Sequence, residues 1–170
     1  MAVLEIFKYP APVLKRVAKP VEEISPEILQ LIDDMIETMY AAPGVGLAAP
    51  QVGQSCRVIV FDANRNESER SPMALINPEI IAADGEFCME EGCLSAPELN
   101  VEIKRKGQVK VKALTRDGRE VTIEAKEFPA VLLQHEIDHL DGKLIIDYLS
   151  GLKRGLYKRK LKRKEEKEKS

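Results

Sequence analysis

The sequence predicts an α+β fold with antiparallel or mixed β-sheets, one helix near the N-terminus, one in the second half and a basic helix at the C-terminus. Two observations support this class. Apolar residues recur at helical spacing in two segments, and the strand-like runs follow one another in antiparallel order instead of alternating with helices. With 170 residues, 44% hydrophobic and 32% charged, the chain has globular composition and can bury a core.

The first helix is expected to begin after Ser25, which can cap it, with Pro26 at the first helical position. Apolar residues recur at helical spacing until Pro43 and Gly44 end the pattern. Segment 44–53 is too rich in glycine for a packed element and too apolar for a plain surface loop. Residues 56–61 are rich in β-branched side chains and are expected to form a buried strand.

A β-hairpin is expected between residues 108 and 125. Apolar and polar residues alternate on both sides of Asp117-Gly118, a dipeptide that favours a tight turn. Pro129 then suits the start of the second helix, and Gly142 suits its C-terminal cap.

The chain shows no sequence signal for secretion or membrane insertion. Its start lacks a basic segment followed by a long apolar run, and no apolar run approaches the roughly 20 residues of a membrane-spanning helix. We therefore expect a soluble, cytoplasmic protein with no membrane partner. Three cysteines in a reducing compartment are more typical of a metal ligand or nucleophile than of a disulfide framework.

Charge divides the chain near residue 150. Residues 151–170 contain ten Lys or Arg and three Glu, which leaves 16 basic and 25 acidic residues in 1–150. We expect 1–150 to form the body of one domain and 151–170 its basic helical tail. Such a tail indicates an anionic partner, although a solvated helix end fits the composition equally well.

Both histidines of the chain lie in the second helix, in the run His135-Glu136-Ile137-Asp138-His139. Residues four apart share a helix face, so both imidazoles can bind one ion. Glu136 adjoins the first ligand and can reach a water molecule on that ion. The alternative, a histidine that only fills the core, would leave Glu136 facing inward without a role.

The third ligand decides the class of enzyme. A zincin-type metallopeptidase completes this helix motif with a downstream His or Glu, but Ile145 stands where the longer motif needs His and the first downstream Glu is Glu165. Cys93 is therefore the expected ligand, with Cys88 as a competitor. A Cys-His-His set leaves a fourth position open, as in catalytic sites. The alternative, a non-catalytic zinc-stabilised module that binds the ribosome or RNA, needs a closed site with four ligands. The spare cysteines Cys56 and Cys88 do not show the paired spacing typical of such a site.

Three segments stand out as motifs: Gly44-Val45-Gly46-Leu47-Ala48-Ala49-Pro50-Gln51, Glu91-Gly92-Cys93-Leu94-Ser95 and Gln134-His135-Glu136-Ile137-Asp138-His139. In order and spacing they resemble the signature motifs of peptide deformylase, and the resemblance extends from about residue 3 to 150. It implies an α+β fold around a central metal-binding helix. It also implies a hydrolase that removes the N-formyl group from the initiator methionine of nascent polypeptides and releases formate.

The resemblance assigns roles to residues around the ion. Glu136 would transfer protons, and the Gln51 amide and the Leu94 backbone N–H would stabilise the oxyanion. Arg105 would pair with Glu91 beside the metal. The native ion would be Fe²⁺, which Zn²⁺, Ni²⁺ or Co²⁺ can replace.

An apolar pocket for methionine is expected beside the metal. Part of it shares a helix face with His135, although that face can equally be plain core. Glycines on the facing loops would allow the substrate backbone to approach as an added strand. The expected residues are Val45, Gly46, Met89, Gly92, Phe128, Val131 and Leu132.

Two further expectations concern partners. Many bacterial relatives have Arg where this chain has Asn100, so we expect contacts beyond the methionine to differ. Family members of this type use their C-terminal helix to dock on the ribosome, and tail 151–170 is expected to do the same.

Overall fold

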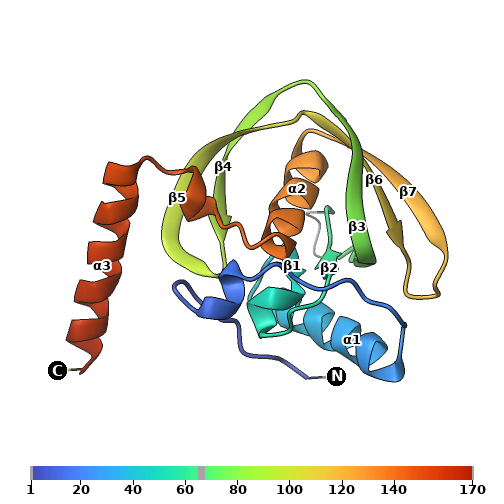
Figure 1. The fold of residues 1–170 in the computed structure, drawn as a ribbon, viewed down its shortest axis with the longest axis horizontal. Coiled ribbons are helices and arrows are strands. Elements are labelled where there is room, and N and C mark those ends of the chain that lie inside the picture. Colours follow the sequence, from blue (N-terminus) through green and yellow to red (C-terminus); the bar gives the residue numbers. More distant parts are fainter. Residues whose placement is uncertain (1, 65–67, 170) are drawn as a thin grey trace.

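The computed structural model describes residues 2–64 and 68–169 and has the α+β architecture that the sequence predicts. Strands surround a central helix, α2 (Phe128–Leu140), as Figure 1 shows. One sheet has the order β1-β2-β3-β6-β7, and β4 and β5 form a separate ribbon; all of these pairs are antiparallel. The strands are β1 (Gly46–Ala48), β2 (Val58–Phe61), β3 (Met73–Asp84), β4 (Phe87–Cys93), β5 (Ala96–Arg105), β6 (Gln108–Leu114) and β7 (Glu120–Lys126).

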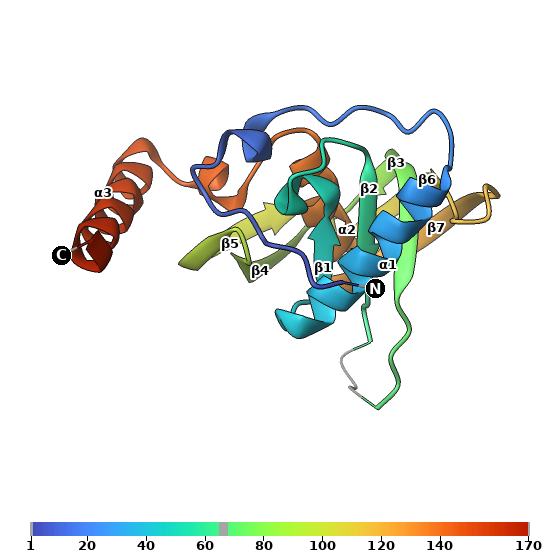
Figure 2. The ribbon, with the colours of Figure 1, turned by 90° about the horizontal axis from the view of Figure 1, so that it is seen from below.

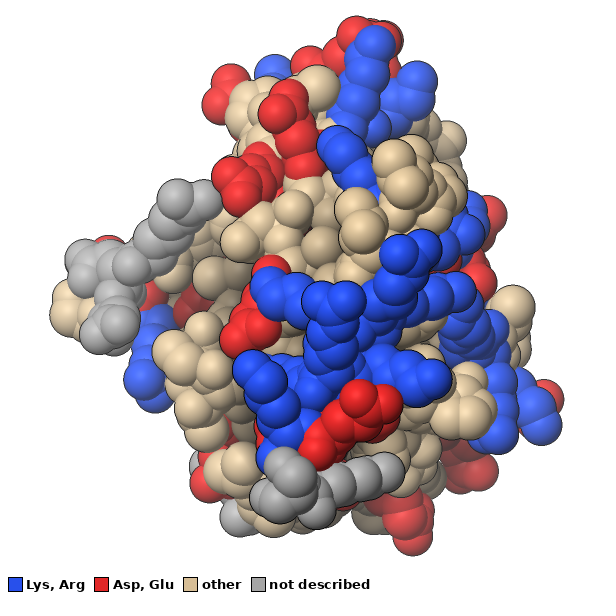
Figure 3. All heavy atoms as spheres, turned by 90° about the vertical axis from the view of Figure 1, so that its left-hand side faces the viewer, with Lys and Arg blue, Asp and Glu red and all other residues tan. Residues whose placement is uncertain are grey.

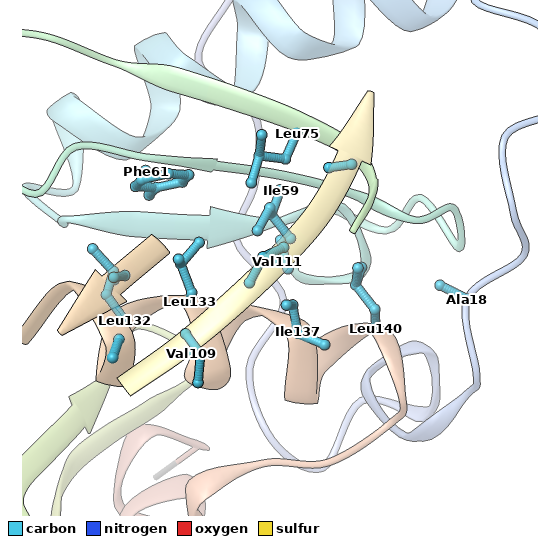
Figure 4. Close-up of a cluster of buried hydrophobic side chains, with 14 residues drawn as sticks. Ala18, Ile59, Phe61, Leu75, Val109, Val111, Leu132, Leu133, Ile137 and Leu140 are labelled. Carbon is cyan, nitrogen blue, oxygen red and sulfur yellow. The ribbon is translucent and has the colours of Figure 1, made fainter. Parts of the chain in front are cut away.

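The part of the five-stranded sheet around β2 is buried on both faces, whereas the second half of β3 and alternate residues of β6 and β7 are exposed. Helix α1 (Pro26–Ala41) and helix α2 lie on opposite sides of it, as Figure 2 shows. Alternate residues of β2 enter the two clusters: Ile59 packs with Leu133 and Ile137 of α2 (Figure 4), and Val58 and Val60 join the cluster that includes α1. The sheet thereby holds α2 rigidly, which matters because α2 carries both histidines.

The two helices predicted inside the body are confirmed, together with their end signals. The Ser25 hydroxyl accepts a hydrogen bond from the Ile28 N–H at 3.3 Å. Gly142, just beyond α2, has φ +75°, and a Cβ there would lie 2.5 Å from the Lys15 carbonyl oxygen. Only glycine suits that position. The predicted hairpin is also confirmed, as β6 and β7.

The prediction for segment 44–53 was wrong. It contains β1 and a 3₁₀ helix, Ala49–Val52, and Leu47, Ala49 and Gln51 are buried. Gly46 permits tight packing against α2, because a Cβ there would lie 2.9 Å from Leu132 Cδ1. The strand expected from residue 56 begins at Val58, since Cys56 makes only an isolated bridge to Lys19.

Helix α3 (Gly151–Lys169) projects away from the sheets at the left of Figure 1. Tyr157 attaches it to the body: its side chain is buried against Tyr9 and Leu14, and its hydroxyl donates to the Pro97 carbonyl at 3.0 Å. Residue 170 of the expected tail lies outside the described residues. None of the described helices combines the length and apolar character that would let it span a membrane.

Candidate metal centre

Cys93, His135 and His139 meet at one end of the β4–β5 ribbon. Cys93 is the last residue of β4, and α2 presents both imidazoles to it. One ligand atom from each lies within 4.8 Å of the others, and Cys93 Sγ lies 3.3 Å from His139 Nε2. Cys88 is exposed on the same strand and takes no part. In the described part of the chain, this is the one group of three or more such side chains placed to hold an ion.

The electrostatics of this triad suit a divalent cation. Burial lowers the pKa of His139 well below its ordinary value, helped by the charges of His135 and Arg105, so the His139 imidazole is neutral and able to bind metal. Burial alone would also lower the pKa of His135. Hydrogen bonds with Cys93 and Glu91 outweigh it and raise that pKa well above its ordinary value. The site thus favours positive charge between the Cys93 sulfur and the Glu91 carboxylate.

A buried ion-pair network fixes the orientation of His135. Glu91 Oε1 lies 2.9 Å from His135 Nδ1, while both Glu91 oxygens accept from Arg105, at 2.8 and 2.9 Å. Arg105 also donates to Asp138 at 2.6 Å, and Tyr148 donates to the same carboxylate at 2.6 Å. With Nδ1 held by Glu91, His135 Nε2 is left for an ion.

The same network sets the charge of Glu91. Burial would raise the pKa of this carboxyl, but hydrogen bonds from His135 and Arg105 and their charges lower it. Glu91 is therefore ionised although only 6% of its surface is exposed. The pairing of Glu91 with Arg105 was predicted, whereas the contacts of Asp138 and Tyr148 were not. No spacing in the chain points to Tyr148, although Asp138 lies inside the histidine motif itself.

Gln51 is buried next to the thiol. Its Oε1 accepts from the Ala48 backbone N–H at 2.9 Å, and its Nε2 donates to Ser95 Oγ at 3.1 Å and faces Cys93 Sγ at 3.7 Å. Ser95 in turn donates to the Phe7 carbonyl at 2.7 Å. These bonds hold the amide N–H group toward the metal-ligand end of the cleft. Ser95 was missed from the sequence because its partner is 88 residues away.

Glu136 is the most enclosed carboxyl group beside the triad, with 2% of its surface exposed. Burial raises its pKa to about 7, against the opposing charges of His135 and Arg105. Its Oε2 has no hydrogen-bond partner among the described residues. A Cβ on Gly46 would lie 2.6 Å from that oxygen, so the absence of a side chain there keeps space in front of it. A buried carboxyl group with a pKa near neutrality and a free oxygen can accept and release a proton.

A cleft of about 490 Å³ opens beside the triad. Gln51, Cys93, Leu94, His135 and Glu136 all line it. So do all seven residues expected to form the methionine pocket: Val45, Gly46, Met89, Gly92, Phe128, Val131 and Leu132. Leu132 also belongs to the core cluster beneath α2, so this helix face is both core and cleft wall.

The family model for polypeptide deformylase matches residues 3–155. The chain belongs to this family. A peptide deformylase of Thermodesulfovibrio yellowstonii is 54% identical over 164 residues, which cover 96% of this chain and 99% of that protein. The crystal structure of a Legionella pneumophila peptide deformylase superposes with a TM-score of 0.90 at 44% identity, covering 98% of each chain. An Ehrlichia chaffeensis peptide deformylase in complex with actinonin has a TM-score of 0.90 at 39% identity, covering 97% of this chain and 99% of that one.

Family membership gives the activity. The protein is a metal-dependent hydrolase that removes the N-formyl group from the initiator methionine of nascent polypeptides. This confirms the function expected from the sequence and disfavours the zincin-type peptidase. The Cys-His-His triad is a possible site for the metal.

Proposed function

We propose that Cys93, His135 and His139 hold the catalytic ion and that Glu136 is the acid–base group of deformylation. The observation that carries this proposal is the adjacency of a three-ligand set to a buried carboxyl group whose pKa is about 7. An ion bound there would polarise the formyl carbonyl and lower the pKa of a water molecule toward neutrality.

Glu136 moves the proton in this scheme. Its free Oε2 accepts a proton from the water that attacks the formyl carbon. The carbon–nitrogen bond then breaks, the methionine amine leaves with the proton that Glu136 returns, and formate carries the water oxygen. Burial of Glu136 favours the protonated form that the second half of this cycle needs.

Gln51 and Leu94 stabilise the negative charge that develops on the formyl oxygen. The Gln51 amide donates from Nε2, held by its bond to Ser95 and by the anchoring of Oε1 on Ala48. The Leu94 backbone N–H follows the Cys93 ligand directly and lies at the same end of the cleft. Donors fixed in advance stabilise an oxyanion without reorganising during the reaction.

The residues around the triad bind the peptide. Val131, Leu132 and Phe128 form an apolar wall for the methionine side chain, with Val45 and Met89 opposite. Gly46 and Gly92 admit the substrate backbone between β1 and β4. We propose Fe²⁺ as the native ion, with Zn²⁺, Ni²⁺ or Co²⁺ as substitutes, because thiolate and imidazole ligands suit first-row divalent metals.

Two cysteines of β4 test the ligand assignment. Cys93→Ser should lose both the bound metal and formate release from a formyl-Met-Ala-Ser peptide. Cys88→Ser, an exposed change on the same strand, should retain both. Metal analysis of protein purified without oxygen measures the metal content and identifies the native ion. The rate assay measures formate release on the same preparations. Full metal content in Cys93→Ser would refute the ligand set.

We further propose that 1–150 form the catalytic domain and that tail 151–170 docks it on the ribosome. Lys and Arg side chains gather on the face that α3 presents in Figure 3. Lys158, Arg159, Lys162 and Arg163 are exposed and make no ion pair with the described residues. Ribosomal RNA offers phosphates, and contacts of this kind weaken steeply with salt.

Substitution tests docking better than deletion does, because deletion would remove the buried Tyr157. A variant with Lys158, Arg159, Lys162 and Arg163 changed to Gln should cosediment less with ribosomes. The control changes four exposed lysines of the body: Lys8, Lys19, Lys106 and Lys143. Equal cosedimentation of the two variants across a salt series would refute docking through α3.

A further inference from the structure

The described residues of the outer substrate cleft include acidic groups and no basic ones. Of the described residues that line the cleft, four are glutamates and none is Lys or Arg. Two of these four glutamates lie beside the Cys-His-His triad: Glu91 is paired with Arg105, and Glu136 is buried. The other two, Glu90 and Glu98, are exposed. Any charge selection on the peptide beyond its methionine therefore depends on these two groups and their neighbours.

The two exposed carboxylates differ in their partners. Glu98 faces α3, where Lys160 Nζ and Lys164 Nζ lie 3.9 and 3.5 Å from its oxygens. Glu90 makes no ion pair with any described residue. No basic side chain of the described residues offsets this carboxyl group beside the cleft.

The register of the ribbon adds a second carboxylate next to Glu90. Along β4, Glu91 points inward while Glu90 and Gly92 lie on the exposed face. Glu90 is directly opposite Glu102, and Gly92 is directly opposite Asn100. Like charges at directly opposed positions of an antiparallel pair destabilise it. Lys104, the next lysine on β5, is paired with Glu86 instead, and Lys153 lines a shallow hollow with Glu102 without forming an ion pair.

We propose that Glu90, reinforced by Glu102, selects formyl-Met peptides that carry Lys or Arg in the two positions after the methionine. This rests on the proposed binding of the peptide beside Gly92. Asn100, which is directly opposite Gly92, is neutral and adds no positive charge where the peptide would bind. A cationic side chain that reaches the exposed face relieves the repulsion between Glu90 and Glu102, whereas an acidic one adds to it.

Matched peptides measure this selection. For formyl-Met-Ala-Lys and formyl-Met-Ala-Glu, and for formyl-Met-Lys-Ser and formyl-Met-Glu-Ser, we expect kcat/KM to favour the Lys member by about two- to fivefold, the range of an exposed charge pair. The preference should shrink as salt is added. The readout is the Lys-to-Glu ratio within each protein, so it does not depend on how active a variant is.

Variants locate the groups responsible. Glu90→Gln should bring the Lys-to-Glu ratio toward one, and Glu102→Gln should lower it by less. Glu86→Gln removes one negative charge near the same ribbon but outside the cleft, and should leave the ratio unchanged. A ratio of one in the unmodified protein, or an equal change in Glu86→Gln and Glu90→Gln, would overturn the proposal. Failure of the proposed chemistry would look different, because Glu136→Gln would then release formate from all these peptides.

Discussion

Helices α2 and α3 use charge in opposite ways. Beside α2, Arg105 and Glu91 are buried, and Arg105 is fixed by its ion pairs with Glu91 and Asp138. On α3 the sequence places ten basic residues, and among the described residues Lys160 and Lys164 reach the body through long contacts with Glu98. Around α2, the electrostatic effect of a charged group depends on the position of single atoms. On α3, the electrostatic potential depends on the sum of many charges that water and salt screen.

The difference shows what burial does to an ionisable group. The buried Glu136 has its pKa raised to about 7, and the buried Glu91 has its pKa lowered by His135 and Arg105. Two carboxyl groups close to the same histidine thereby have pKa values shifted in opposite directions, which suits the proton transfer proposed for Glu136 and an ionised Glu91. No comparable separation can arise on α3, where water surrounds the charges.

The largest effect is expected at Glu136. Glu136→Gln keeps the shape of the side chain but removes the proton acceptor, so we expect kcat to fall by about 10²- to 10⁴-fold while the metal is retained. Rate and metal content are measured on one preparation. Glu127→Gln, an exposed change just before α2, serves as the control and should keep its rate. Near-normal turnover in Glu136→Gln would refute the acid–base role proposed for Glu136.

Two adjacent residues of β5 compare buried and exposed charge directly. Arg105→Leu would leave Glu91 and Asp138 without their partner, and we expect a loss of about 3–5 kcal/mol in the free energy of unfolding. Lys104→Leu breaks only the exposed pair with Glu86 and should change that free energy by less than about 1 kcal/mol. Urea unfolding measures both. Similar losses in the two variants would contradict the contrast between the regions.

A smaller effect is expected where α3 meets the body. Tyr157→Ala should lower the free energy of unfolding by about 3 kcal/mol because it opens the cluster around Tyr9 and Leu14. Tyr157→Phe loses only the hydrogen bond to Pro97, about 1 kcal/mol. Leu152→Ala, in the exposed first turn, should stay within about 0.5 kcal/mol. If Tyr157→Ala were as mild as Leu152→Ala, α3 would not be anchored through this residue.

Local signals in the sequence were sufficient for the helices and the hairpin. Ser25, Pro26 and the period of the apolar residues predicted α1, and Asp117-Gly118 predicted the turn between β6 and β7. Segment 44–53 was misjudged because glycine content was taken to weaken packing. In the fold, Gly46 is what lets β1 approach α2, and that requirement comes from a helix 90 residues away.

In the candidate site too, local spacing could be predicted from the sequence, whereas contacts made by the tertiary fold could not. The helical spacing of His135 and His139 predicted that two possible ligands share one helix face, and the structure places Cys93 beside them. Ser95, Asp138 and Tyr148 were not predicted, because each acts through a partner that only the tertiary fold supplies. The contact of Tyr157 with the body was not predicted either, because it depends on Tyr9 and Leu14, more than 140 residues earlier.

Two glycines, one beside α2 and one in α3, are expected to respond differently to replacement by alanine. A Cβ on Gly155 of α3 would meet no atom within 4 Å, so Gly155→Ala should raise the free energy of unfolding by about 0.5–1 kcal/mol through the higher helix propensity of alanine. A Cβ on Gly46 would lie 2.6 Å from Glu136 Oε2 and 2.9 Å from Leu132 Cδ1, so Gly46→Ala should slow formate release. Urea unfolding and the rate assay, run on both variants, give four values. A Gly46→Ala protein with unchanged turnover would mean that the space in front of Glu136 is not needed for the reaction.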